Sequence, residues 1–154
     1  EAQQYNSIYF TKDSLDASKR ASSKLSFLVS MVLYGSSLSN GFALLRPPGH
    51  HACPHQANGY CILNHVAIAA SKVVAEDPTK RVLIVDWDVH HGNGTQAVFS
   101  TNNNNNNTTA ISCSNILYVS MHQLSLFPHC GKAIAGPTFV GNNNNNKGME
   151  SLFV

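Results

Sequence analysis

The sequence contains few charged residues. Asp, Glu, Lys and Arg make up 12% of the 154 residues, about half the share usual in globular domains, and the formal net charge is only +2. The Lys and Arg residues are scattered, so no basic patch indicates direct binding to nucleic acid. Hydrophobic residues reach 43%, enough to bury the core of one domain. We therefore expect a single globular unit that meets its partners through the chemistry of a site.

Long hydrophobic runs and regularly spaced cysteines are also missing. The longest apolar stretch, around residues 27–34, is interrupted by Ser30 and falls far short of the ~20 residues that cross a bilayer. The four cysteines are irregularly spaced, form no C-x-x-C pair and follow no apolar leader with a cleavage signature. We expect a soluble protein with reduced thiols and no membrane partner.

Hydrophobic periodicity predicts alternating helices and strands. Apolar residues at three- and four-residue steps predict a helix over 11–34, and an Ala- and Val-rich segment predicts a second over 64–76. Apolar runs at 42–45, 81–85 and 116–121 predict strands, buried at 42–45 and covered on both faces at 81–85. This order is typical of an α/β fold whose mainly parallel sheet carries helices on both faces.

Two asparagine tracts do not fit a packed core. Residues 102–107 and 142–146 are pure asparagine, too polar to offset the entropy lost on ordering, and we interpret them as low-complexity inserts or loops. Residues 148–154 follow without a clear closing element. We expect the fold to be incomplete.

Polar side chains gather directly after the strand at 81–85. If the backbone stays extended there, Asp86, Asp88 and His90 share one face, at the strand end where parallel sheets bind ligands. Two buried carboxylates and an imidazole need a cation or bonded partners, and zinc suits this mixed set. A catalytic zinc takes three protein ligands and acidifies a water in the fourth position. The alternative is that Asp86 caps a turn and His90 is a hydrogen-bonded core histidine.

The adjacent pair His50 and His51 follows a rigid Pro47-Pro48-Gly49 turn. Histidines suit acid–base work because their unperturbed pKa lies near neutrality, and one nearby carboxylate would give the two rings different roles. An exposed loop pair is the plain alternative. A structural zinc loop that adds Cys53 and His55 is disfavoured by its tight spacing, and a serine hydrolase by the absence of a G-x-S-x-G elbow.

Three segments together resemble the signature of class II histone deacetylases. They are RPPGHHA at 46–52, GYCILN at 59–64 and DWDVHHGNGT at 86–95, in the family's order and at similar spacing. The resemblance covers roughly residues 5–128. It implies an arginase/deacetylase-like, three-layer α/β fold with the site at the carboxyl ends of the strands, and it identifies residues 1–154 as a partial catalytic domain.

The resemblance also implies roles for five residues. Asp88 and His90 match two of the family's zinc ligands. His50 and His51 match its tandem histidines, of which the second is the general base towards water. Asp86 matches the carboxylate that orients the first histidine. Zn²⁺ is therefore the implied cofactor.

The family's substrate is an N-acetyl-lysine side chain, which needs a narrow tunnel with aromatic walls. Tyr60 and Phe127 match the two wall positions, although the family more often has Phe at the first, and both could instead be core aromatics. Gly59 matches the backbone beside which the stem passes, and Ser7 matches a rim residue. Asn93 stands beside the second histidine, as in many class II members.

Further implications concern a second cation, partners and location. A structural K⁺ site would draw mostly on backbone oxygens of five residues, namely Asp86, Asp88, His90, Ser120 and Met121. The implied partners are an acetylated histone or another acetyl-lysine protein and a corepressor complex, in the nucleus and/or the cytoplasm.

The sequence departs from the family in two places. The third zinc ligand should be a downstream aspartate and the oxyanion-stabilising residue a tyrosine. However, the only acidic residue after Asp88 is Glu150, and no tyrosine follows Tyr118. Loss of oxyanion stabilisation typically costs about 3 kcal/mol or more in the barrier. We expect this chain to be a fragment that is inactive alone, the alternatives being a non-catalytic remnant or an acetylpolyamine amidohydrolase.

Overall fold

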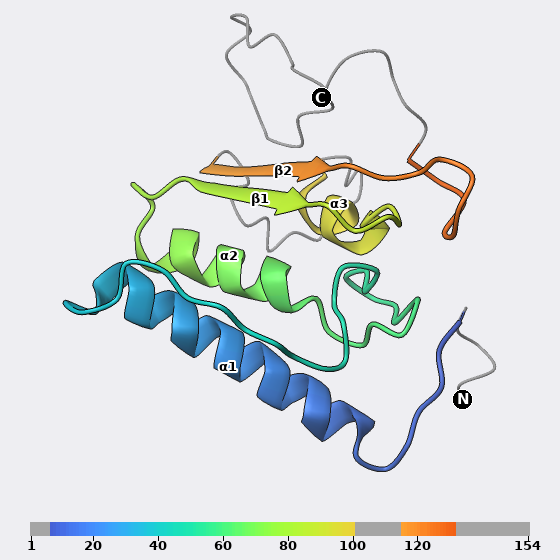
Figure 1. Cartoon of the computed structure of the whole chain (residues 1–154), viewed down its shortest axis with the longest axis horizontal. Coiled ribbons are helices and arrows are strands. Elements are labelled where there is room, and N and C mark those ends of the chain that lie inside the picture. The colour runs from blue at the N-terminus through green and yellow to red at the C-terminus, as the bar shows by residue number, and fades with distance from the viewer. Residues whose placement is uncertain (1–6, 101–114, 132–154) are drawn as a thin grey trace, which may run out of the picture.

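The computed structural model describes residues 7–100 and 115–131. The elements are, in order, α1 (Ser14–Tyr34), α2 (His65–Glu76), β1 (Val82–Asp86), α3 (Asn93–Phe99) and β2 (Ile116–Ser120). Figure 1 shows α1, α2, β1 and β2 one above the other in this order, with α3 near the ends of the strands. The helices and strands predicted at 11–34, 64–76, 81–85 and 116–121 are confirmed to within three residues at each end. The short helix α3 was not defined by the hydrophobic pattern.

The two strands form a parallel pair. Val82 lies opposite Ile116 and Asp86 opposite Ser120, so the even-numbered residues of both strands point to the same face. That face packs against α2 and α3. The buried cluster between them consists of Ala67, Ala70, Val74, Ile84, Phe99, Ile116 and Tyr118. The predicted parallel α/β core is present, and it extends towards the carboxyl ends of β1 and β2.

The opposite face of the sheet is uncovered within the described residues. Leu83 and Val85 are 62% and 46% exposed, because both helices that contact the sheet, α2 and α3, lie on the even-numbered face. For this part of the chain, the expectation that the strand at 81–85 is covered on both sides is wrong. The described residues show the sheet and one helical side of the layered fold.

The strand expected at 42–45 is not formed. Phe42 and Leu44 are 87% and 89% exposed, and residues 41–45 pair with no strand within the described ranges. A cavity of about 620 Å³, lined by α1, α2, Gly41, Ala43 and residues 80–85, adjoins both this segment and β1. A strand needs a hydrogen-bonded neighbour, and residues 41–45 share this cavity with β1 without pairing to it.

Several expectations concern residues outside this description. Both asparagine tracts and residues 148–154 lie there. Among the described helices, none combines the length and the apolar character that a membrane crossing requires.

A buried histidine joins α1 and α2 to the loop that carries the tandem histidines. His65 Nδ1 accepts a hydrogen bond from the Ser22 hydroxyl at 2.7 Å, and His65 Nε2 donates to the Pro47 carbonyl at 2.9 Å. Burial lowers the pKa of His65, which outweighs the opposing effect of the bond to Pro47. The neutral ring therefore fixes the entry to the His50–His51 loop.

Removal of the Ser22 hydroxyl should destabilise the fold. In Ser22→Ala the buried Nδ1 of His65 has no donor, which costs about 1–3 kcal/mol in the free energy of unfolding. Ser23→Ala is the matched control, because it makes the same change in the same helix at an exposed position. Urea unfolding of the two variants measures the difference, and equal free energies would show that the Ser22–His65 bond contributes nothing.

Candidate active site

The tandem-histidine loop is fastened to the two helices beside it. Asn64 caps α2 by accepting from the Ala67 amide at 3.1 Å, while its own amide donates to the Ala52 carbonyl at 3.3 Å and to Thr95 Oγ1 at 3.0 Å. The Thr95 amide in α3 donates to the His50 carbonyl at 3.1 Å. The position of His50 and His51 is thus set by hydrogen bonds to both α2 and α3.

His50 forms a pair with the last residue of β1. Its Nδ1 donates to Asp86 Oδ2 at 2.9 Å, and both side chains are mostly buried. Burial by itself would raise the pKa of Asp86. The hydrogen bond and charge of His50, together with bonds from Tyr118 and the Asp88 amide, outweigh burial and lower that pKa. Asp86 is therefore a carboxylate at neutral pH and orients the His50 ring, as the sequence predicts.

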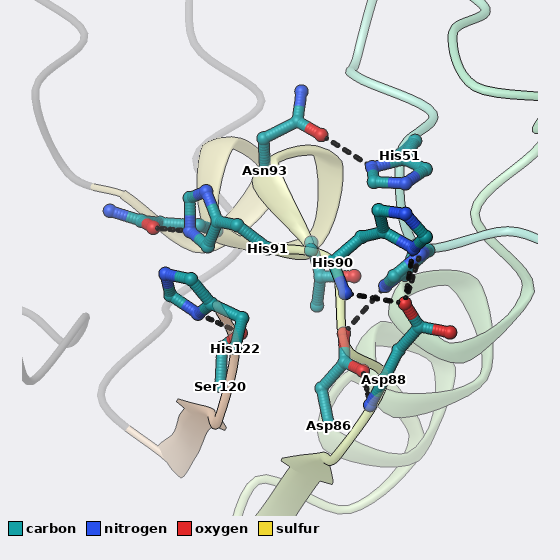
Figure 2. Close-up of polar contacts among 12 residues, drawn as sticks. His51, Asp86, Asp88, His90, His91, Asn93, Ser120 and His122 are labelled. Carbon is teal, nitrogen blue, oxygen red and sulfur yellow. Dashed lines mark hydrogen bonds and ion pairs between the residues drawn. The ribbon is translucent and has the colours of Figure 1, made fainter. Parts of the chain in front are cut away.

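His51 is held by an amide instead of a carboxylate. Its Nδ1 lies 2.8 Å from Asn93 Oδ1, which can only accept, so Nδ1 carries the proton and Nε2 has a free lone pair (Figure 2). The residue is 5% exposed, and burial lowers its pKa although the bond to Asn93 acts in the opposite sense. A neutral ring with an unprotonated Nε2 is suited to accept a proton.

Asp88 and His90 bond to each other next to these pairs. Asp88 Oδ1 accepts from the His90 backbone amide at 2.7 Å and from its ring Nδ1 at 2.9 Å (Figure 2). The Asp88 Oδ1 atom lies 3.9 Å from His50 Nε2, and the His90 ring lies 6.0 Å from that of His51. The structure thus brings together the five residues predicted as catalytic or metal-binding.

The chemistry of Asp88 and His90 fits a zinc site in part. Two ligand atoms on a tetrahedral zinc lie about 3.3 Å apart, and the 2.9 Å between Asp88 Oδ1 and His90 Nδ1 is slightly less. In the described part of the chain, however, no group of three or more His, Cys, Asp or Glu side chains is arranged to hold a metal ion. The role of Asp88 and His90 as two zinc ligands therefore stays a prediction, and within the same residues no metal-binding group forms around Cys53 and His55.

Aromatic and glycine residues border the histidines. The half-buried Phe127 ring stands edge-on to the His51 ring, with centroids 5.0 Å apart at 86°. Gly59 has a φ of +50°, and a Cβ there would lie 2.5 Å from His51 Cδ2 and 2.8 Å from Phe127 Cε1. Only glycine fits this close approach. Phe127 and Gly59 therefore lie against the proposed base, where wall residues are expected.

Tyr60 and Ser7 lie at the surface of the same region. Tyr60 is 69% exposed, which excludes the alternative that it is a core aromatic, and its amide donates to the Ser7 carbonyl at 2.9 Å. Ser7 is exposed as well. Tyr60 and Ser7 are therefore neighbours at the surface of this region.

Two of the residues predicted to bind K⁺ lie at the end of β2. The Met121 amide donates to the Asp86 carbonyl at 2.9 Å, and Ser120 Oγ is bonded to His122 Nδ1 at 2.9 Å. This places both beside the Asp86–His90 loop. Their role in binding K⁺ stays a prediction.

The sequence reasoning missed two buried residues next to the site. Tyr118 donates its hydroxyl proton towards Asp86 Oδ2 at 2.8 Å and the Gly92 carbonyl at 3.1 Å. His91 bonds to Gln96 and lies 3.2 Å from Cys130 Sγ. The pairing of β1 with β2 could have placed Tyr118 on the Asp86 face, because both are even-numbered positions in register. Nothing in the local pattern separates His91 from its neighbour His90.

A histidine pair with carboxylate and amide partners, beside an aspartate and a histidine able to bind metal, defines a candidate metal-assisted hydrolase site on a parallel α/β sheet. Comparison with known proteins identifies the family. Residues 1–149 match the model of the histone deacetylase domain, and the chain belongs to the histone deacetylase family.

Named relatives agree with this assignment. The chain is 39% identical over 121 residues to Histone deacetylase 6 of Caenorhabditis elegans, covering 78% of this chain and 12% of that protein. It is 40% identical over 122 residues to Polyamine deacetylase HDAC10 of Mus musculus, covering 79% and 16%. The chain thus spans less than a fifth of the length of either relative.

A solved structure confirms the predicted fold class. The crystal structure of the HDA15 HD domain superposes with a TM-score of 0.62 at 40% identity, over 80% of this chain and 33% of that one. The arginase/deacetylase-like α/β fold expected from the sequence is therefore present, as a part of the domain.

The amide partner of His51 should govern its protonation. Asn93→Asp places a carboxylate against Nδ1 and should raise the pKa of His51 by about 1–3 units, from a value that burial lowers. Asn40→Asp adds the same charge at an exposed loop position and is the control. An NMR titration of the His51 ring measures both variants. If Asn93→Asp leaves the pKa where Asn40→Asp leaves it, the amide does not set the state of His51.

Proposed function

We propose that this chain supplies the histidine-bearing part of a zinc-dependent deacetylase that hydrolyses N-acetyl-lysine in histones or other proteins. The observation that carries the proposal is the convergence of His50–Asp86, His51–Asn93 and Asp88–His90 at the ends of the strands. Membership of the histone deacetylase family supports the same reaction class.

The hydrogen bonds of His50 and His51 support different proposed roles for the two histidines. His51, neutral and unprotonated at Nε2, takes a proton from the attacking water. His50, oriented by Asp86, is the acid that gives a proton to the departing lysine amine, so that water and amide become acetate and amine. Transfer of the proton gained by His51 to His50, whose ring centroid lies 4.0 Å away, then restores both histidines. Zinc held by Asp88 and His90, when bound, would acidify water and polarise the amide carbonyl.

The proposed binding of the substrate uses the aromatic border of the site. The acetyl-lysine stem is apolar and thin. The Phe127 ring would give it an apolar wall beside His51, and Gly59, which has no side chain, would leave room for it. Tyr60 and Ser7 lie further out, where they would contact the peptide that carries the lysine. A structural K⁺ near Ser120, a corepressor complex and a nuclear and/or cytoplasmic location belong to the same proposal.

Two other functions have specific support. A mouse relative at 40% identity is named a polyamine deacetylase, which favours an acetylpolyamine as a second candidate substrate. In the described residues, two zinc donors without a third favour a remnant that binds acetylated chains without turnover. The assay that follows includes both possibilities.

The test is hydrolysis of an acetyl-lysine histone peptide and of acetylspermidine by the zinc-loaded, full-length protein that contains this chain. His51→Ala should lower the rate on the peptide by about a hundredfold or more, because the base is lost. His55→Ala is the control, since it removes an exposed histidine from the same loop. Asp88→Asn should weaken zinc binding, measured by competition with a chromophoric chelator.

The outcomes distinguish between the candidate functions. Faster turnover of acetylspermidine than of the peptide would favour the polyamine function. Peptide binding without turnover in the protein before mutation would favour the remnant. Equal rates for His51→Ala and His55→Ala, or zinc binding unaffected by Asp88→Asn, would refute the proposed mechanism.

A further inference from the structure

Tyr118 of β2 reaches into the His50–Asp86 pair from the core. Its hydroxyl lies 2.8 Å from Asp86 Oδ2, the same oxygen that accepts the Nδ1 proton of His50 at 2.9 Å. The residue is 3% exposed, and its ring belongs to the buried cluster between the sheet and α2. A core side chain and a site histidine therefore share one carboxylate oxygen.

The pairing of the strands explains how this contact arises. Tyr118 lies opposite Ile84 in the parallel register, and Asp86 follows two positions later on the same face. The phenol side chain of Tyr118 is long enough for its hydroxyl to reach the Asp86 carboxylate at 2.8 Å. A shorter apolar residue at 118 would fill the core without reaching the carboxylate.

Gly92 leaves space for this contact. The Tyr118 hydroxyl lies 3.1 Å from the Gly92 carbonyl. A Cβ at position 92 would overlap both the Tyr118 hydroxyl oxygen and Asp86 Oδ2 and would lie 3.2 Å from His50 Nδ1. Gly92, the residue directly before α3, must therefore be small for the tyrosine, the carboxylate and the histidine to meet.

The hydroxyl can act only as a donor to these groups. Asp86 Oδ2 and the Gly92 carbonyl are both acceptors, and Asp86 Oδ1 is separately engaged by the Asp88 amide at 3.2 Å. Burial, and after it the charge of Asp86, raises the pKa of Tyr118, so the proton stays on the hydroxyl at neutral pH. The Asp86 carboxylate thus accepts hydrogen bonds from His50 in the tandem-histidine loop, from the Asp88 backbone amide and from Tyr118 in β2.

We propose that Tyr118 is a positioning residue of the site: its hydroxyl fixes the Asp86 carboxylate in the orientation that holds the His50 ring. Tyr118 does not touch substrate and acts through Asp86. Its significance for catalysis depends on the proposed deacetylase function, whereas its effect on the His50 ring depends only on the hydrogen bonds described.

The test removes a single oxygen atom. In Tyr118→Phe the ring still fills the core, and Asp86 Oδ2 loses the hydroxyl donor. Tyr34→Phe makes the same change at an exposed position in α1 and is the matched control. Nitrogen-15 NMR of histidine-labelled protein reports the tautomer and the Nδ1 proton of His50. The His50 signals should shift in Tyr118→Phe and stay unchanged in Tyr34→Phe.

A second variant and the unmodified protein guard against a folding defect. Gly92→Ala keeps every hydrogen-bonding group and should perturb the same His50 signals, because its methyl group overlaps the contact. In the unmodified protein, the Tyr118 hydroxyl proton should exchange slowly and show a nuclear Overhauser effect to the His50 ring. Unchanged His50 signals in a folded Tyr118→Phe variant, or the absence of that effect in the unmodified protein, would overturn the proposal.

Turnover gives an independent readout. In the zinc-loaded, full-length protein that contains this chain, Tyr118→Phe should lower kcat about tenfold with KM unchanged, as removal of a residue that orients a site group does. An unchanged kcat would refute the link to catalysis. If the full-length protein that contains this chain hydrolyses no acetyl-lysine, the proposed function fails, and the NMR comparison still decides whether Tyr118 positions His50.

Discussion

The need to satisfy one mostly buried carboxylate at the end of β1 organises the whole site. A carboxylate in the place of Asp86 would destabilise the fold by several kcal/mol if it had no partners. The structure supplies a donor from the tandem-histidine loop, a donor from β2 and a donor from the backbone of Asp88. The bonds from His50 and Tyr118 join segments that are far apart in sequence, so the fold of the loop and the geometry of the site share the same contacts.

The sequence predicted which polar residues meet, but not how they meet. Period-two alternation placed Asp86, Asp88 and His90 on one side, and they are close together. The backbone is nevertheless not extended there, because β1 ends at Asp86 and Asp88 accepts bonds from the amide and ring of His90. The His90 side chain is 40% exposed, which excludes the alternative of a core histidine. The turn-capping alternative is partly right, since Asp86 Oδ1 accepts from the Asp88 amide.

The predictions that failed concerned the strand at 42–45, which is not formed, and the burial of apolar side chains. Leu83, Phe42 and Leu44 have the composition of buried strands, and in the described part of the chain they face no covering layer. An apolar sequence pattern indicates that a segment favours burial. Whether the segment is buried depends on other parts of the fold, which its own sequence does not determine. Helix periodicity was more reliable, because α1 and α2 form from local hydrogen bonds and pack on each other within the described residues.

Tyr118 shows why local patterns could not complete the site. A tyrosine within an apolar strand is typical of a core residue, and its ring does lie in the core. Only the register between β1 and β2 reveals that the same even-numbered face changes from apolar to polar after Ile84, where Asp86 and Ser120 follow. The core and the site are therefore one continuous surface, and the tyrosine spans the boundary with its ring on the apolar side and its hydroxyl on the charged side. Repacking beneath this ring would consequently alter the orientation of Asp86 and, through it, of His50.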